Sequence, residues 1–138
     1  MVASQASFAA INGTKMYYEI KGEGHPLVMI HGLPVDSRMW DAQFDELSKQ
    51  FQVIRFDLPG YGRSHVHHED YHLLKDIKSL LEYLNIERMN LLGLSVGGKL
   101  GIEFTIEHPE MVDSLIVAST GLTGWSEVSP QNKSMMKK

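Results

Sequence analysis

Gly93-Leu94-Ser95-Val96-Gly97 is the stretch that decides the fold of this chain. A short apolar run precedes it at residues 89–92, and a helical pattern of apolar and small residues follows it. A G-x-S-x-G pattern between a buried strand and a helix is typical of a nucleophile elbow, a strained turn that lifts a serine hydroxyl above the end of a parallel sheet. Its glycines let neighbouring backbone pass closely. The pattern predicts Ser95 as a nucleophile and Gly93 and Gly97 as the elbow glycines.

Length and composition are those of an ordinary globular domain, because the chain has 138 residues, 43% of them hydrophobic and 22% charged. A formal net charge of -4 gives no broad attraction to nucleic acid or anionic lipid, so neither is expected as a partner. The absence of cysteine excludes disulfides and thiolate chemistry. The N-terminus has no signal-peptide pattern and no segment has the length of a membrane span, so a cytoplasmic protein is expected.

Strand and helix signals alternate along the chain. Asn12-Gly13 predicts a tight antiparallel hairpin, because both residues tolerate positive φ. The expected strands cover residues 8–11, 15–20, 26–30, 52–56, 89–92 and Ser114 to Ser119. Helices are expected at about 37–50, across Tyr71 to Leu84, and from the elbow to about His108. This order predicts an α/β fold with a mostly parallel sheet of about six strands, an antiparallel N-terminal hairpin, and helices on both faces.

Several motifs taken together resemble the α/β-hydrolase fold family. They are the Asn12-Gly13 hairpin, His31-Gly32-Leu33-Pro34, Asp57-Leu58-Pro59-Gly60-Tyr61-Gly62-Arg63-Ser64 and Gly93-Leu94-Ser95-Val96-Gly97-Gly98. The resemblance covers almost all of the chain but only the N-terminal half of the family's pattern, through the strand after the elbow helix. Residues 1–120 are therefore expected to form a truncated domain of this type, and residues 121–138 a polar C-terminal tail.

The resemblance implies a serine hydrolase of the esterase or acyl hydrolase class. Ser95 would attack an acyl carbonyl, and the backbone N–H groups of Leu33 and Val96 would form the oxyanion hole. A serine at this position argues against relatives that use aspartate there, such as dehalogenases and epoxide hydrolases. No cofactor is implied, and the expected partner is a small ester or acyl substrate.

The triad base and acid have no convincing candidates in the same chain. His31 is a candidate base, although the resemblance favours a structural role in bonding backbone around its loop. His108 is the only histidine after Ser95, and about 13 residues of helix would put it roughly 20 Å away. No carboxylate follows the strand from Ser114 until Glu127, and Asp57 is expected to brace the loop that follows it.

A cluster of histidines offers further base candidates. His65, His67 and His68 precede His72, and a partner chain could bring this loop to Ser95. Metal binding is the alternative role for the cluster. Because no cysteine or well-placed carboxylate completes a tetrahedral site, a solvated loop is expected and no metal.

The strand from Ser114 to Ser119 is expected to lie at a sheet edge. Leu115, Ile116 and Val117 are apolar toward both faces, so the edge lacks the charges and prolines that usually protect one. A homodimer through this edge, or through an uncovered sheet face, is therefore expected. Two functions stay open: a serine hydrolase completed by a partner chain, and a non-catalytic or minimal hydrolase fragment that acts as an assembly module and folds as an oligomer.

Overall fold

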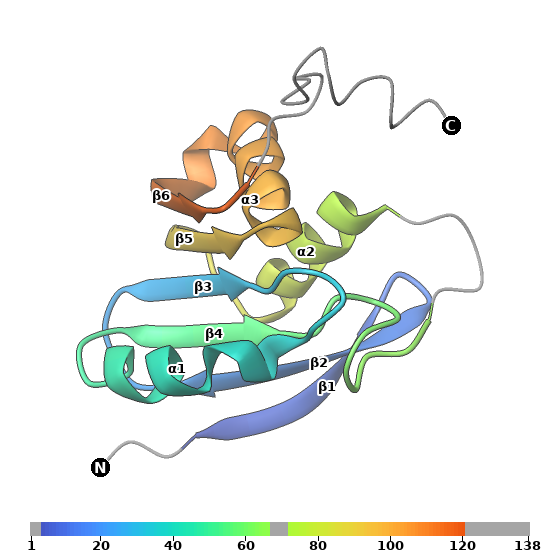
Figure 1. The fold of residues 1–138 in the computed structure, drawn as a ribbon, viewed down its shortest axis with the longest axis horizontal. Coiled ribbons are helices and arrows are strands. Elements are labelled where there is room, and N and C mark those ends of the chain that lie inside the picture. The colour runs from blue at the N-terminus through green and yellow to red at the C-terminus, as the bar shows by residue number, and fades with distance from the viewer. Residues whose placement is uncertain (1–3, 67–71, 121–138) are drawn as a thin grey trace, which may run out of the picture.

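The computed structural model describes residues 4–66 and 72–120, which form a six-stranded sheet in the order β1-β2-β4-β3-β5-β6 (Figure 1). The strands are β1 (Gln5–Ile11), β2 (Thr14–Lys21), β3 (Pro26–Ile30), β4 (Gln52–Phe56), β5 (Met89–Leu94) and β6 (Val112–Ala118). The helices are α1 (Asp41–Leu47), α2 (Leu73–Tyr83) and α3 (Val96–Glu107), with short 3-10 helices η1 (Ser37–Trp40) and η2 (Pro109–Met111). None of these helices is long and apolar enough to cross a membrane. The expected tail at residues 121–138 lies outside the described residues.

The sheet has the predicted mixed topology. β1 pairs antiparallel with β2, and their turn uses positive φ at Asn12 (45°) and Gly13 (84°), as the sequence predicts. β2 pairs antiparallel with β4, whereas the pairs β4–β3, β3–β5 and β5–β6 are parallel. The predicted α/β fold is therefore confirmed. The helix expected at 37–50 is shorter: it starts as η1, where the Asp36 side chain accepts from the Arg38 N–H, and its α-helical part ends at Leu47.

Helices cover both faces of the sheet, as predicted (Figure 1). Alternate residues of β3 divide between two hydrophobic clusters because side chains of a strand point to opposite faces. Leu27 and Met29 pack with η1 and α1, whereas Val28 and Ile30 belong to the larger core under α2 and α3. The central strands are thus buried on both sides, which explains their continuous apolar sequence.

A buried arginine ties α1 to the sheet. Arg55 on β4 is 8% exposed and donates hydrogen bonds to Glu19 on β2 at 2.6 Å and to Asp41 on α1 at 2.6 Å. Its guanidinium carbon lies 4.1 Å from the centre of the Phe44 ring. Arg55 is the one basic residue of its strand, and that is the only sign of this network in the sequence.

Strand β6 is the edge of the described sheet, as expected. It runs from Val112 rather than Ser114, because the turn of η2 delivers the chain directly into it, and it ends before Ser119, where φ is 51°. Ile116 and Val117 are 56% and 40% exposed. Ile116 pairs with the half-buried Leu92 of β5, so both lie on the face that carries α1. This end of the sheet therefore presents apolar side chains to solvent.

Candidate active site

Ser95 occupies a strained turn between β5 and α3. Its φ is 55° and its ψ is -117°, a conformation that costs a residue with a side chain of order 1–3 kcal/mol. The side chain is half-buried, and within residues 4–66 and 72–120 its hydroxyl has no hydrogen-bond partner. Ser95 is therefore held in the geometry of an elbow with a free hydroxyl.

The elbow glycines are required by close backbone contacts. A Cβ atom on Gly93 would lie 2.3 Å from the carbonyl oxygen of Gly97, and one on Gly97 would lie 2.2 Å from the carbonyl oxygen of Ile30. Backbone atoms cannot give way as the end of a flexible side chain can. The first turn of α3 therefore packs directly on the ends of β3 and β5.

The last residue of β6 and Thr120 just after it hold the backbone of Ser95. The Ser95 N–H donates to the Ala118 carbonyl at 2.9 Å, and the Thr120 hydroxyl donates to the Ser95 carbonyl at 2.8 Å. Strained conformations persist where surrounding contacts over-determine them, and these two bonds contribute to that restraint. Sequence reasoning missed Thr120, whose only signal is a hydroxyl directly after an apolar strand.

Two backbone N–H groups are available for an oxyanion. Val96 is the first residue of α3, and neither its N–H nor that of Leu33 donates a hydrogen bond within the part of the chain that the structure describes. Gly32, which precedes Leu33, packs on the elbow: a Cβ atom there would lie 3.4 Å from the Ser95 Cβ. The structure thus brings the Leu33 loop, Val96 and Ser95 together, and the helix N-terminus favours negative charge there.

His31 bonds the backbone with both ring nitrogens. Its Nε2 accepts from the Leu58 N–H at 2.9 Å, and its Nδ1 lies 2.7 Å from the Gly32 carbonyl oxygen. This pairing assigns the proton to Nδ1 in a neutral imidazole. The ring is fully buried, and burial lowers the pKa of His31 below its ordinary value of 6.5. His31 therefore has the structural role of bonding the backbone around its loop, and neither ring nitrogen is left to accept the proton of Ser95.

Asp57 braces the loop that follows it, as expected. Its Oδ1 accepts from the Ser37 N–H at 2.8 Å and its Oδ2 from the Arg63 N–H at 2.9 Å. The carboxylate is 2% exposed and lies against Gly62, where a Cβ atom would clash with it. Asp57 thereby joins the segment after β3 to the loop after β4.

The other candidate histidines are not joined to Ser95. His65 is exposed, and its ring lies 6.2 Å from that of Phe8. His108, beyond the last turn of α3, packs on Phe104. His67 and His68 lie outside the described residues. Among the residues that are described, no group of His, Cys, Asp and Glu has the arrangement of a metal site.

Comparisons with known proteins agree on the fold. A sequence model described as alpha/beta hydrolase fold matches residues 25–138. The (E)-2-((N-methylformamido)methylene)succinate hydrolase of Acinetobacter baylyi is 34% identical over 77% of this chain and 41% of its own length. The soluble epoxide hydrolase of a Corynebacterium species is 30% identical over 79% of this chain and 39% of its own.

Among solved structures, the enol-lactonase of Burkholderia xenovorans is 34% identical with a TM-score of 0.74. That match covers 79% of this chain and 45% of the enol-lactonase chain. The chain thus spans less than half the length of the curated relatives it matches.

The close contact of Gly97 predicts a large effect of a single methyl group. We expect Gly97→Ala to lower the free energy of unfolding by about 3 kcal/mol, because its Cβ would overlap two backbone carbonyls. The control is Gly101→Ala in the same helix, where the new Cβ would lie 3.1 Å from the end of the Leu115 side chain and in ordinary contact with Leu91, and where helix propensity improves. That change should stay under about 1 kcal/mol. Urea unfolding followed by circular dichroism measures both, and equal losses would contradict the packing argument.

The buried imidazole of His31 predicts a pH dependence of stability. The pKa of His31 is lowered in the folded state, so the unfolded chain binds more protons as the pH falls through about 6.5. The contribution of the neutral His31 to the free energy of unfolding is therefore complete above that pH and is lost below it. The slope from one such group reaches about 1.4 kcal/mol per pH unit. Urea unfolding between pH 5 and pH 7.5 should show a shallower slope for His31→Gln than for the exposed control His72→Gln. Identical slopes would rule out this role.

Proposed function

The chain belongs to the alpha/beta hydrolase fold family, and from this premise we propose that it hydrolyses esters or related acyl compounds with Ser95 as the nucleophile. The observation that carries the proposal is the strained conformation of Ser95 at the end of β5, next to two free backbone N–H groups. Strain in the backbone concentrates at functional sites. A serine needed only for packing would not require this conformation.

In the proposed reaction the Ser95 hydroxyl attacks the carbonyl carbon of the substrate while a base takes its proton. The carbonyl oxygen becomes an oxyanion, which the N–H groups of Leu33 and Val96 stabilise. The intermediate collapses and releases the alcohol, and water then hydrolyses the acyl-serine. Helix α3 points its N-terminal end at the same oxygen, so its dipole acts in the same direction.

We propose that the base and acid for Ser95 come from outside the described residues. Both nitrogens of His31 and both carboxylate oxygens of Asp57 already bond backbone groups. A partner chain is one source of a histidine, and the loop that contains His67 and His68 is another. Without a base the reaction should be slow, because the oxyanion hole and binding alone retain about 10³ to 10⁴-fold over water.

The relatives favour an acyl substrate. One is named as an (E)-2-((N-methylformamido)methylene)succinate hydrolase and another as an enol-lactonase, and a lactone is a cyclic ester. The likeness to a soluble epoxide hydrolase extends over the same half of the fold, but the elbow residue in this chain is a serine, which suits acyl transfer.

The nucleophile is tested by covalent labelling together with hydrolysis. A fluorophosphonate probe should label the purified chain, and Ser95→Ala should abolish labelling and lower p-nitrophenyl acetate hydrolysis to the rate given by surface histidines. Ser79→Ala on α2 is the matched control and should retain both activities. Mass spectrometry locates the label. Equal rates and equal labelling in Ser95→Ala and Ser79→Ala would refute the enzymatic role.

A second candidate function is a non-catalytic assembly module, which we propose because β6 presents exposed apolar residues and, within residues 4–66 and 72–120, pairs with no strand on its outer side. Ile116 is 56% exposed, and Ile106 on the adjacent α3 is 75% exposed. Strand edges of this kind pair with further strands unless charges, prolines or covering segments prevent it. A homodimer through β6 satisfies the edge, and the same dimer could supply the missing base.

The dimer is tested by light scattering at micromolar concentration. The chain should have the mass of a dimer, and Ile116→Lys should shift it toward the monomer because a charge on the edge opposes strand pairing. Val66→Lys, at a site that is 57% exposed and lies on the loop after β4, should remain dimeric. A monomeric mass for the unmodified chain, with cooperative unfolding, would exclude this assembly.

A further inference from the structure

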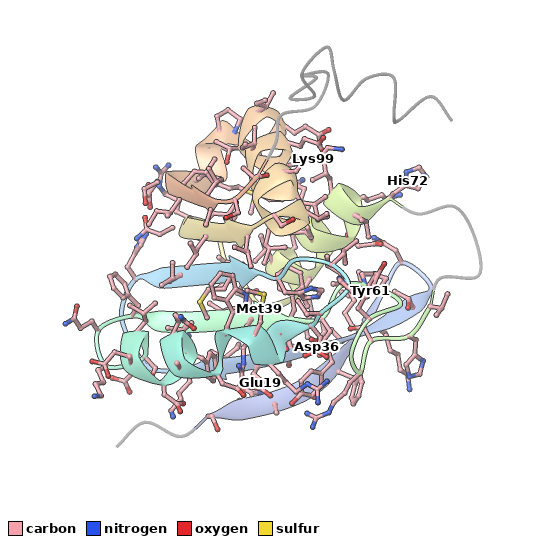
Figure 2. The ribbon with its side chains drawn as sticks, viewed as in Figure 1. Glu19, Asp36, Met39, Tyr61, His72 and Lys99 are labelled. Atoms are coloured by element: carbon pink, nitrogen blue, oxygen red, sulfur yellow. The ribbon has the colours of Figure 1, made fainter. Side chains whose placement is uncertain are left out.

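A polar cavity of about 150 Å³ lies beside η1, apart from Ser95. Its walls come from β2, from the segment that enters η1, and from the loop after β4. Figure 2 labels two of its residues, Glu19 and Asp36, on the side of the sheet that carries α1. The lining residues are Tyr17, Glu19, Asp36, Ser37, Arg38, Asp57, Gly62 and Arg63.

The carboxylates of this cavity have their oxygens occupied. Both oxygens of Asp36 accept from Arg38, which helps to hold the pKa of Asp36 at about 2, and both oxygens of Asp57 accept from backbone N–H groups. Glu19 accepts from a tyrosine hydroxyl with one oxygen and from Arg55 with the other. Each of these carboxylate oxygens therefore already accepts at least one hydrogen bond, and Arg55 is shared between Glu19 and Asp41.

Two donors in the cavity wall have unused capacity. The Arg63 side chain is exposed and lies over the Tyr17 ring at 4.7 Å, and within the described residues its guanidinium makes a single hydrogen bond, from Nη1 to the Tyr17 hydroxyl at 2.7 Å. Ser37 is 2% exposed and its hydroxyl has no partner there. Among the described residues, the Trp40 indole N–H is the only side-chain polar group that is both sealed from solvent and without a hydrogen-bond partner. The Ser37 hydroxyl is therefore not sealed, and because Ser37 lines the cavity, its hydroxyl opens onto it.

Buried polar groups are normally hydrogen-bonded, so the buried Ser37 hydroxyl calls for an acceptor, and the exposed Arg63 guanidinium beside it can exchange water for the same acceptor. We propose that the cavity binds a small oxyanion, a carboxylate or a phosphate, through the Arg63 guanidinium and the Ser37 hydroxyl. A guanidinium presents a fork of donors that matches the paired oxygens of such anions. The volume is similar to that of a cavity of about 150 Å³ that holds benzene, so an anion of about five heavy atoms fits. The site does not depend on the chemistry of Ser95.

The proposal is tested by titrating the purified chain with inorganic phosphate and, separately, with acetate at constant ionic strength. Two-dimensional NMR of backbone amides and of arginine Nε–H groups should show saturable shifts at Ser37, Gly62 and Arg63. Arg63→Gln should weaken binding by about tenfold, because a charge-assisted hydrogen bond is lost. Ser37→Ala should weaken it by about threefold, in line with a neutral hydrogen bond.

Lys75→Gln on α2 is the matched control, since it removes one positive charge at an exposed site away from the cavity. Its affinity should stay within about twofold of the unmodified chain, because exposed charges interact weakly. Saturable binding of one anion alone identifies that class as the ligand. Non-saturable shifts, or equal affinities for Arg63→Gln and Lys75→Gln, would overturn the proposal. If Arg63→Gln does not fold, an unchanged affinity in Ser37→Ala overturns it by itself.

Discussion

The direct packing of the first turn of α3 on the ends of β3 and β5 is the constraint on which the candidate site depends. Gly97 lies so close to Ile30 that no side chain fits between them, and Gly93 lies equally close to Gly97. The chain must therefore reverse within a single residue, which forces Ser95 to positive φ. The same packing puts the Val96 N–H at a helix start, where it has no intrahelical acceptor. One steric fact thus produces both the strained conformation of Ser95 and the free N–H of Val96, which is one half of the proposed oxyanion hole.

The loop that carries Leu33, the other half of the proposed oxyanion hole, relies on polar contacts between loops. His31 joins the loop after β3 to Leu58, and Asp57 joins the start of η1 to the loop at Arg63. Each side chain replaces backbone hydrogen bonds that an irregular loop could not make by itself. The segments after β3 and β4 are consequently held as one unit, and the proposed anion cavity lies between the same two segments. An anion held by Ser37 and Arg63 would add a third link between them.

The elements and the elbow could be predicted because their signals are local. Asn12-Gly13 requires positive φ, and the G-x-S-x-G pattern can be recognised within five residues, although the contact that requires Gly97 is with the distant Ile30. The network of Arg55 with Glu19, and the clamp by Thr120, could not be predicted. Each joins residues that are distant in the chain, and their geometry follows from strand order and register, which local patterns do not specify.

The positioning of Ser95 is therefore physically separate from any activation of its hydroxyl. Holding Ser95 in its conformation costs of order 1–3 kcal/mol, and the hydrogen bonds of its backbone to Ala118 at the end of β6 and to Thr120 offset about 1 kcal/mol each. The close packing of α3 restrains the turn further, so the elbow stands without any triad partner. Oxyanion donors act on charge that appears only in the transition state, and they too need no base to be in place. A base placed within hydrogen-bond reach of Ser95 would thus complete a site whose other parts are already positioned, with no rearrangement of the sheet.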